Sequence, residues 1–151
     1  MLLIGLHKVV LDAKGRLAIP ALYRPKLEEH CQSKLVITVQ HHGKSLMLYP
    51  ENEFEQVAQV VSRLSDFDKA EQRFKLAFFG HAMPLEMDSS GRVLVPPLLR
   101  ELVGIEKRVA LVGATNKLEL WNEETWNETQ KTLFSSDDNQ AIPEKLKDIS
   151  L

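Results

Sequence analysis

Two short stretches of this sequence place an arginine four residues after an aspartate, with a glycine directly before the arginine. The first is "DAKGR" at residues 12–16, and the second is "DSSGR" at residues 88–92. An aspartate oxygen can accept hydrogen bonds from nearby backbone N–H groups, and glycine readily takes the positive φ of a tight turn. An arginine that leaves such a turn can bind phosphate oxygens or the O6 and N7 atoms of guanine. The pattern predicts two turns that each present a guanidinium group to an anionic partner.

The two stretches differ in their charge. Arg16 is accompanied by Lys14 in its turn and by Lys8 on the strand expected before it, whereas Ser90 takes the place of the turn lysine beside Arg92. A lysine ammonium group contributes a point charge that can contact the DNA backbone. We therefore expect Lys8, Lys14 and Arg16 to form a compact cationic surface toward an anionic partner, with a smaller contribution from Arg92.

A structural role is expected for the other residues of the repeated motif. Across each turn the aspartate is expected to face the arginine, and an exposed ion pair of this kind contributes at most about 1 kcal/mol. A second arginine follows the first by eight residues in both copies. For this arginine, pairing with a nearby carboxylate competes with contact to an anionic partner. The residues assigned to structure are Asp12, Gly15, Arg24, Asp88, Gly91 and Arg100.

The duplication extends beyond the turns. The stretch "LDAKGRLAIP" (11–20) aligns with "MDSSGRVLVP" (87–96), and "LMLYPENEF" (46–54) aligns with "LELWNEETW" (118–126). A unit of about seventy residues is marginally stable when it folds alone, so the two halves are expected to share one core.

Each repeated unit carries the same expected elements. A β-hairpin around the turn is followed by a short helix that opens with proline, then by two paired strands and an amphipathic helix. Pro25 lies past the expected first turn of its helix, so we expect a kink or two short turns there. The domains are expected at 1–66 (first repeat), 67–80 (connecting helix), 81–134 (second repeat) and 135–151 (acidic linker and short C-terminal tail helix).

The composition restricts the partners. The chain has 151 residues and a net charge of −2, yet residues 1–50 carry seven Lys/Arg against three Asp/Glu. A basic N-terminal region on an acidic body can place positive potential on one face, although uneven charge alone does not identify a polyanion partner. The start "MLLIGLHKVVLD" lacks the apolar length of a signal peptide, and we find no membrane-spanning run. We expect a cytoplasmic protein with no membrane partner.

Catalysis is the first alternative function. Its best material is the pair His41–His42, with Asp12, Glu28 or Glu29 as metal or acid–base partners. The pair lies in an expected loop without an H-x-x-x-H or C-x-x-C companion, and the sequence has no P-loop, dinucleotide fingerprint or nucleophile elbow. The only cysteine, at position 31, is interpreted as a semi-buried thiol. We expect no enzyme activity, cofactor, metal or small-molecule substrate.

The combination of hairpin, D-x-x-x-R turn, proline and short helix, used twice, resembles the MraZ family of the AbrB-like, swapped-hairpin superfamily. The likeness runs nearly end to end and is also carried by "FFGHAMPLEMDSSGRVLVPPLLRE", "ALVGATNKLELWNEETW" and "LKDISL". It implies an α+β fold of two duplicated AbrB-like (SpoVT-AbrB) swapped-hairpin β-barrel units, related by a pseudo-two-fold axis and flanked by α-helices.

The resemblance also implies a function. It points to a nucleoid-associated, sequence-specific DNA-binding transcription regulator of its own operon and of a division and cell-wall gene cluster. In such a protein Lys8, Lys14 and Arg16 would make the main DNA contact, with a smaller contribution from Arg92. Its partners would be double-stranded DNA with tandem short promoter repeats and further copies of the chain in a homo-oligomeric ring. The second alternative is an oligomeric protein-binding scaffold that does not read DNA directly.

Overall fold

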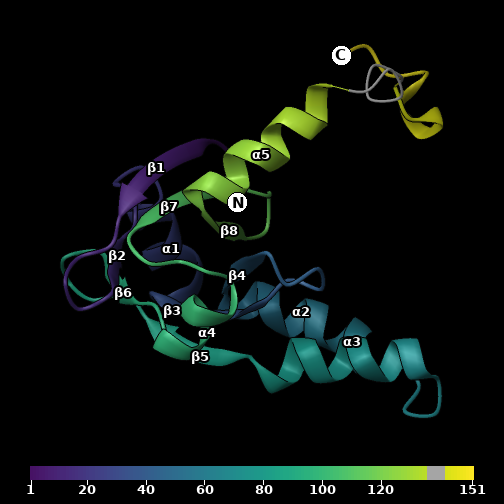
Figure 1. Cartoon of the computed structure of the whole chain (residues 1–151), viewed down its shortest axis with the longest axis horizontal. Helices are drawn as coiled ribbons and strands as arrows, with labels where there is room; N and C mark the ends of the chain where they lie inside the picture. The colour runs from purple at the N-terminus through teal and green to yellow at the C-terminus, as the bar shows by residue number, and fades with distance from the viewer. Residues whose placement is uncertain (136–141) are drawn as a thin grey trace.

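Six strands form one antiparallel sheet, and two shorter strands form a separate ladder. The computed structural model describes residues 1–135 and 142–151 (Figure 1). The small ladder pairs β2 (Arg16–Ala18) with β6 (Arg92–Leu94). In the large sheet the order is β1 (Leu6–Val10), β7 (Arg108–Gly113), β8 (Leu118–Asn122), β4 (Ser45–Pro50), β3 (Lys34–Val39) and β5 (Met83–Glu86). The fold is α+β, and both sheets combine strands from the two repeated halves.

The prediction of a β-hairpin around the first turn is wrong, because the two strands that flank the turn do not pair with each other. Each strand that flanks the turn takes its partner from the other half, because β1 pairs with β7 and β2 pairs with β6. In the second half β5 likewise pairs with β3 of the first half. The turn is closed locally, with Asp12 N donating to Arg16 O at 3.0 Å. Pairing between halves covers strand edges that a short hairpin would leave open.

One hydrophobic core joins the two halves, as the duplication predicts. Leu17 and Ile19 follow the first turn, Val93 and Val95 follow the second, and all four are at most 1% exposed within a single cluster. Leu17 also lies directly opposite Val93 in the β2–β6 ladder. Because successive side chains of a strand alternate between its faces, the remaining residues of β2 and β6 point outward.

The short helix after each turn begins with a proline in its first turn. Helix α1 spans Arg24–Cys31 and helix α4 spans Pro97–Leu102, with Gly104 at φ +71° just beyond the end of α4. Of the kink or two short turns expected around Pro25, the kink is wrong: a turn at residues 21–23 comes first, and α1 then holds Pro25 in its own first turn. The missing N–H of proline breaks no helical hydrogen bond at that position.

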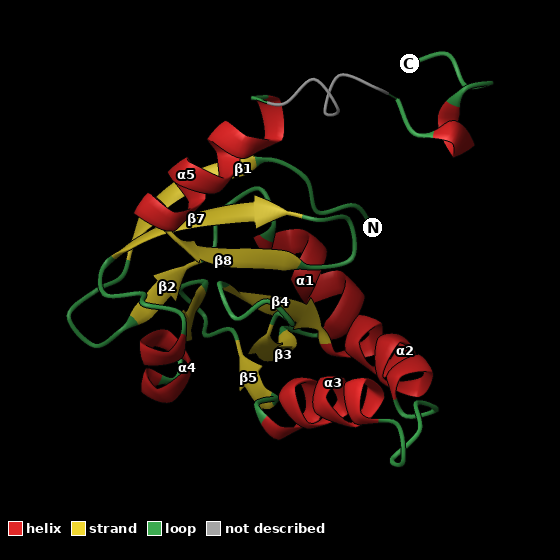
Figure 2. Ribbon diagram, turned by 45° about the vertical axis from the view of Figure 1, so that its right-hand side comes forward, coloured by secondary structure: helices red, strands yellow, loops and turns green. Residues whose placement is uncertain are grey.

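Two helices cover the first half of the large sheet. Helices α2 (Glu51–Val61) and α3 (Lys69–Gly80) lie side by side at one end of the molecule (Figure 2). Phe78 of α3 packs in a cluster with Tyr49 of β4, and Thr38 Oγ1 of β3 donates to Phe78 O at 2.6 Å. Part of each apolar stripe predicted for these helices therefore packs against the sheet.

Helix α5 (Glu123–Phe134) takes the place of α2 in the second half. Trp121 of β8 meets Trp126 of α5 with ring centroids 5.5 Å apart, as Tyr49 meets Phe54 at 5.8 Å in the first half. The expected linker falls largely on residues 136–141, outside the described residues, and the expected tail helix is a single 3₁₀ turn at Glu144–Leu146. Among the described residues, none of the helices has the length and hydropathy needed to cross a membrane.

Candidate nucleic-acid interface

The first repeated turn is built by one aspartate oxygen and one glycine. Asp12 Oδ1 accepts hydrogen bonds from the backbone N–H groups of Lys14 and Arg16, both at 2.9 Å. Gly15 has φ +82°, and its N–H donates to Asp12 O at 2.9 Å. The positive φ predicted for this glycine is confirmed, and it is the conformation that glycine adopts without a steric cost.

The second turn repeats this backbone. Asp88 Oδ1 accepts from the backbone N–H groups of Ser90 and Arg92 at 2.9 Å each, and Gly91 has φ +76°. The local spacing of aspartate, glycine and arginine therefore specifies the same turn twice.

The arginines of the two turns point away from the core on the same face of the β2–β6 ladder. Arg16 lies opposite Leu94, and Arg92 lies opposite Ala18, while the residues between them are buried. Both arginine side chains are partly accessible, with 30% of the Arg16 side chain and 36% of the Arg92 side chain exposed. This outward face of β2 and β6, with the two turns, is called the arginine face below.

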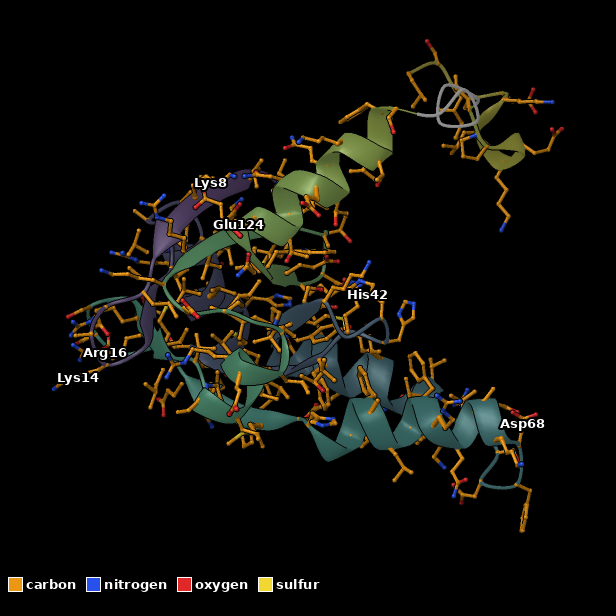
Figure 3. All side chains as sticks on the ribbon, viewed as in Figure 1. Lys8, Lys14, Arg16, His42, Asp68 and Glu124 are labelled. Atoms are coloured by element: carbon orange, nitrogen blue, oxygen red, sulfur yellow. The ribbon has the colours of Figure 1, made fainter. Side chains whose placement is uncertain are left out.

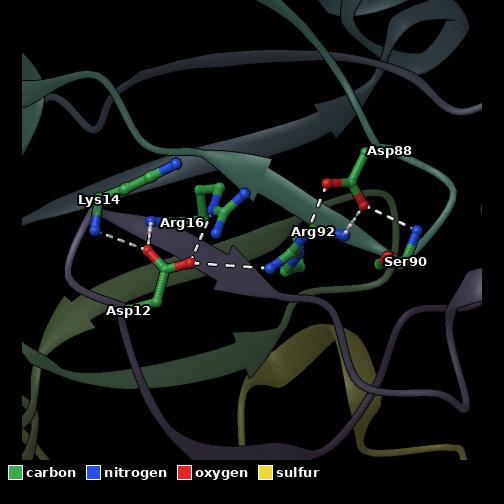
Figure 4. Close-up of polar contacts among 6 residues, drawn as sticks. All are labelled: Asp12, Lys14, Arg16, Asp88, Ser90 and Arg92. Atoms are coloured by element: carbon green, nitrogen blue, oxygen red, sulfur yellow. Dashed lines mark hydrogen bonds and ion pairs between the residues drawn. The ribbon is translucent and has the colours of Figure 1, made fainter.

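Four charged side chains meet on the arginine face (Figure 4). Arg16 Nε donates to Asp12 Oδ2 at 2.6 Å, as expected for a pair across the turn. Arg92 Nε lies 3.5 Å from Asp88 Oδ2, and Arg92 Nη1 lies 4.0 Å from Asp12 Oδ2. One carboxylate of the first half thus contacts the arginines of both halves.

The surroundings of the two aspartates keep both ionised. The backbone N–H of Arg16 is the main cause that lowers the pKa of Asp12 to about 2. Desolvation opposes it, and the side chain of Arg16 and the N–H of Lys14 lower the pKa further. The backbone N–H of Arg92 is the main cause of a lowered pKa at Asp88, to which the charge of Arg16 also contributes. Each arginine is therefore accompanied by a full negative charge at neutral pH.

Arg24 and Arg100 each donate to a backbone carbonyl of their own half and pack against the glycine of the opposite turn. Arg24 Nε donates to Ile19 O at 2.7 Å, and Arg100 Nε donates to Val95 O at 3.2 Å. A Cβ atom added at Gly15 would lie 2.8 Å from the Arg100 guanidinium, and one added to the glycine of the second turn would lie still closer to Arg24. The partner found here is a backbone carbonyl instead of the expected carboxylate. The sequence alone gives no sign of this crossing, since it depends on how the halves pack.

Lys8 is not part of the arginine face. Its Nζ donates to Asn127 Oδ1 at 2.8 Å and lies 3.7 Å from Glu123 Oε1, so the side chain is directed to α5. Figure 3 shows Lys8 well apart from Lys14 and Arg16. The prediction that Lys8 shares a compact cationic surface with Lys14 and Arg16 is therefore wrong. Lys14 is exposed in the first turn, as predicted.

His42 and Asp12, two of the residues considered for catalysis, do not lie together in the structure. His42 packs against Trp121 with ring centroids 5.3 Å apart and accepts from Lys44 N at 3.0 Å. His42 lies far from Arg16, and therefore also far from Asp12, which accepts a hydrogen bond from Arg16 (Figure 3). Within residues 1–135 and 142–151, no group of three or more His, Cys, Asp or Glu side chains is placed to hold a metal ion.

The geometry defines a duplicated α+β chain with two arginine turns on one outward face. The family model described as "MraZ protein, putative antitoxin-like" matches residues 2–77 and again residues 78–149. The chain therefore belongs to the MraZ family.

Its relatives cover nearly all of the chain. "Transcriptional regulator MraZ" of Thioalkalivibrio sulfidiphilus (strain HL-EbGR7) is 42% identical over 139 residues, which is 92% of both chains. The protein of the same name from Saccharophagus degradans is 38% identical over 147 residues, 97% of this chain and 98% of the relative. That from Yersinia pseudotuberculosis serotype O:1b (strain IP 31758) is 42% identical over 149 residues, with the same coverage.

Proposed function

We propose that this chain is a transcription regulator that binds duplex DNA through its arginine face. The observation that carries the proposal is the placement of Arg16 and Arg92 side by side, pointing outward on β2 and β6 above a fully buried layer. The relatives' name, transcriptional regulator, supports it. A protein of this kind acts on the nucleoid, in the cytoplasm.

Each cation has a distinct part in this binding. Arg16 uses Nε for Asp12, so its two terminal nitrogens are left to fork onto guanine or a phosphate. Lys14 is exposed beside it and supplies a phosphate contact. Arg92 adds a second guanidinium, with a serine in place of the turn lysine.

One arginine face alone would bind DNA weakly, since it neutralises few phosphates on a chain of net charge −2. We propose that several copies form a ring whose arginine faces engage tandem short repeats in the promoter of its own operon and of a division and cell-wall gene cluster. Linked contacts raise avidity by about 10² to 10⁴ when their spacing matches. Exposed apolar side chains on α3 and α4 support self-association: Phe74, Leu76, Phe79, Leu98 and Leu102.

We also propose that the chain consists of two swapped-hairpin barrel units, a repeat at 1–66 and a repeat at 81–134, joined by the segment 67–80. The pairing of strands between the halves is the basis of this division. The exchange of β1 and β5 between the halves supports this division. The exposed apolar side chains of α3 also favour a second candidate function, a ring that serves as a scaffold for a protein partner.

A gel shift separates the two candidate functions. The probes are the duplex upstream of the coding sequence and a base-shuffled duplex of equal length. The regulator is expected to shift the upstream duplex at clearly lower protein concentration, whereas a scaffold would shift both alike or neither. Light scattering tests the ring separately: we expect a mass above that of a tetramer, and a mass near 17.2 kDa would contradict it.

A further inference from the structure

Building on the proposed DNA binding, we propose that Asp12 is the positioning residue that orients the guanidinium groups of both halves and so sets how well they discriminate base sequence. Asp12 does not itself contact DNA in this account. It acts through Arg16 of its own turn and through Arg92 of the other turn, which both approach its Oδ2 atom.

The two oxygens of Asp12 have separate tasks. Oδ1 accepts both backbone N–H groups and builds the turn. Oδ2 makes the 2.6 Å hydrogen bond to Arg16 Nε and lies 4.0 Å from Arg92 Nη1. Turn formation and arginine orientation therefore rest on different atoms, and a substitution that changes only one of them can separate the two roles.

The contact at Nε fixes the direction of the Arg16 guanidinium. A guanidinium group is planar, with its donors in a rigid fork, so a partner at Nε directs the two terminal nitrogens away from that partner. The Asp12 side chain is 33% exposed and that of Arg16 is 30% exposed, so the pair is partly shielded from solvent. An arginine held in this way can make the bidentate contact that distinguishes guanine from other bases.

The second turn lacks an equally firm anchor. Asp88 Oδ2 lies 3.5 Å from Arg92 Nε, and that buried Nε makes no hydrogen bond within the described residues. Arg92 therefore depends on Asp12 for part of its orientation. The four side chains form one electrostatic cluster, since Asp12 Oδ2 lies within 4.0 Å of both arginines and Asp88 Oδ2 lies 3.5 Å from Arg92.

The test is Asp12→Asn, with Asp88→Asn as the matched control. In Asp12→Asn the amide oxygen can still accept the two backbone N–H groups, while the amide NH₂ faces the Arg16 Nε–H and cannot accept it. We expect the ratio of affinities for the upstream and shuffled duplexes to fall about tenfold. Affinity for the shuffled duplex should be kept or rise, because a negative charge is removed from the arginine face. The melting temperature should fall less than in a variant that lacks the turn-building oxygen, because the amide oxygen still accepts both backbone N–H groups.

Asp88→Asn should lower the same ratio about threefold or less, since its arginine is held less closely. A third variant, Asp12→Ala, removes the turn-building oxygen as well and should lower the melting temperature.

Two outcomes would overturn the inference while the proposed function stands. One is an Asp12→Asn protein with the wild-type ratio. The other is an equal loss of affinity for both duplexes together with a melting temperature as low as that of Asp12→Ala, which would show a purely structural role. If wild type itself does not distinguish the two duplexes, the proposed function fails, and the positioning role fails with it.

Discussion

The two turns share a backbone but hold their arginines differently. Both have an aspartate Oδ1 that accepts two N–H groups at 2.9 Å, and both have a glycine at positive φ. In the first turn the arginine Nε is bonded at 2.6 Å, whereas in the second the corresponding separation is 3.5 Å. The aspartate and glycine reproduce the turn, while the contacts of the outward side chains vary.

This difference predicts that the two halves contribute unequally to DNA binding. The first turn combines a firmly held arginine with an exposed lysine, and the second has an arginine and two serines. We therefore expect substitutions in the first turn to have larger effects on DNA binding than their counterparts in the second.

Gly15→Val should produce the largest effect, on folding itself. Valine at φ +82° is strained, and its Cβ would lie 2.8 Å from the guanidinium of Arg100. We expect a loss of about 2 kcal/mol or more in the free energy of unfolding, measured by urea denaturation.

Gly43→Val is the matched control for this substitution. Gly43 has φ +72°, but within the described part of the chain no atom lies within 4 Å of an added Cβ. Gly43→Val introduces the backbone strain without the steric clash, so its loss in the free energy of unfolding should be smaller than that of Gly15→Val. Equal losses in the two variants would show that the Arg100 contact has no importance for the turn.

Arg92→Ala should weaken binding to the upstream duplex by less than Arg16→Ala does. One arginine contact of about 1 kcal/mol is lost per turn in each case, but Arg92 lacks a neighbouring lysine and a hydrogen-bonded Nε. Fluorescence anisotropy at one salt concentration measures both variants. A larger loss for Arg92→Ala would reverse the ranking of the two turns.

A comparison of Lys14→Ala with Lys8→Ala tests whether DNA contacts the arginine face. Lys14 is exposed on the arginine face, so its removal should reduce the slope of log affinity against log salt by about one. Lys8 is bonded to Asn127 and Glu123, and Lys8→Ala should leave that slope nearly unchanged. A larger change for Lys8→Ala would place the DNA contact nearer to α5.

The smallest effect concerns the pH dependence of stability. Asp12 has a pKa of about 2 in the folded chain against an ordinary value of 3.8. Its contribution to stability is therefore complete above about pH 4 and is lost as the pH falls toward 2. Thermal unfolding of Asp12→Asn should show a shallower loss of stability than wild type over that interval. Identical slopes would show that the Asp12 carboxylate is not specially stabilised in the folded chain.

The local parts of the site could be predicted from the sequence. Asp12, Gly15 and Arg16 lie within five residues, so their spacing alone determines which N–H groups the aspartate oxygen meets and where the positive φ falls. The outward direction of the arginine follows from the alternation along β2.

Contacts between the halves could not be predicted in this way. The hairpin prediction failed because β1 and β2 find their partners in β7 and β6, which lie far away along the chain. Lys8 was misplaced for the same reason, since its partners belong to α5. The packing of Arg24 against Gly91 of the opposite turn likewise depends on how the halves meet.

The most direct test of the arginine face is the affinity of wild type and Arg16→Ala for the upstream duplex over a series of salt concentrations, with the mass of each protein verified by light scattering. Arg16→Ala should keep its oligomer mass and nearly its melting temperature, because only a partly exposed ion pair to Asp12 is lost. Its affinity should fall by about tenfold or more, since every subunit loses a contact, and the salt slope should flatten. Wild-type affinity in an intact Arg16→Ala oligomer would contradict the assignment of DNA binding to this face.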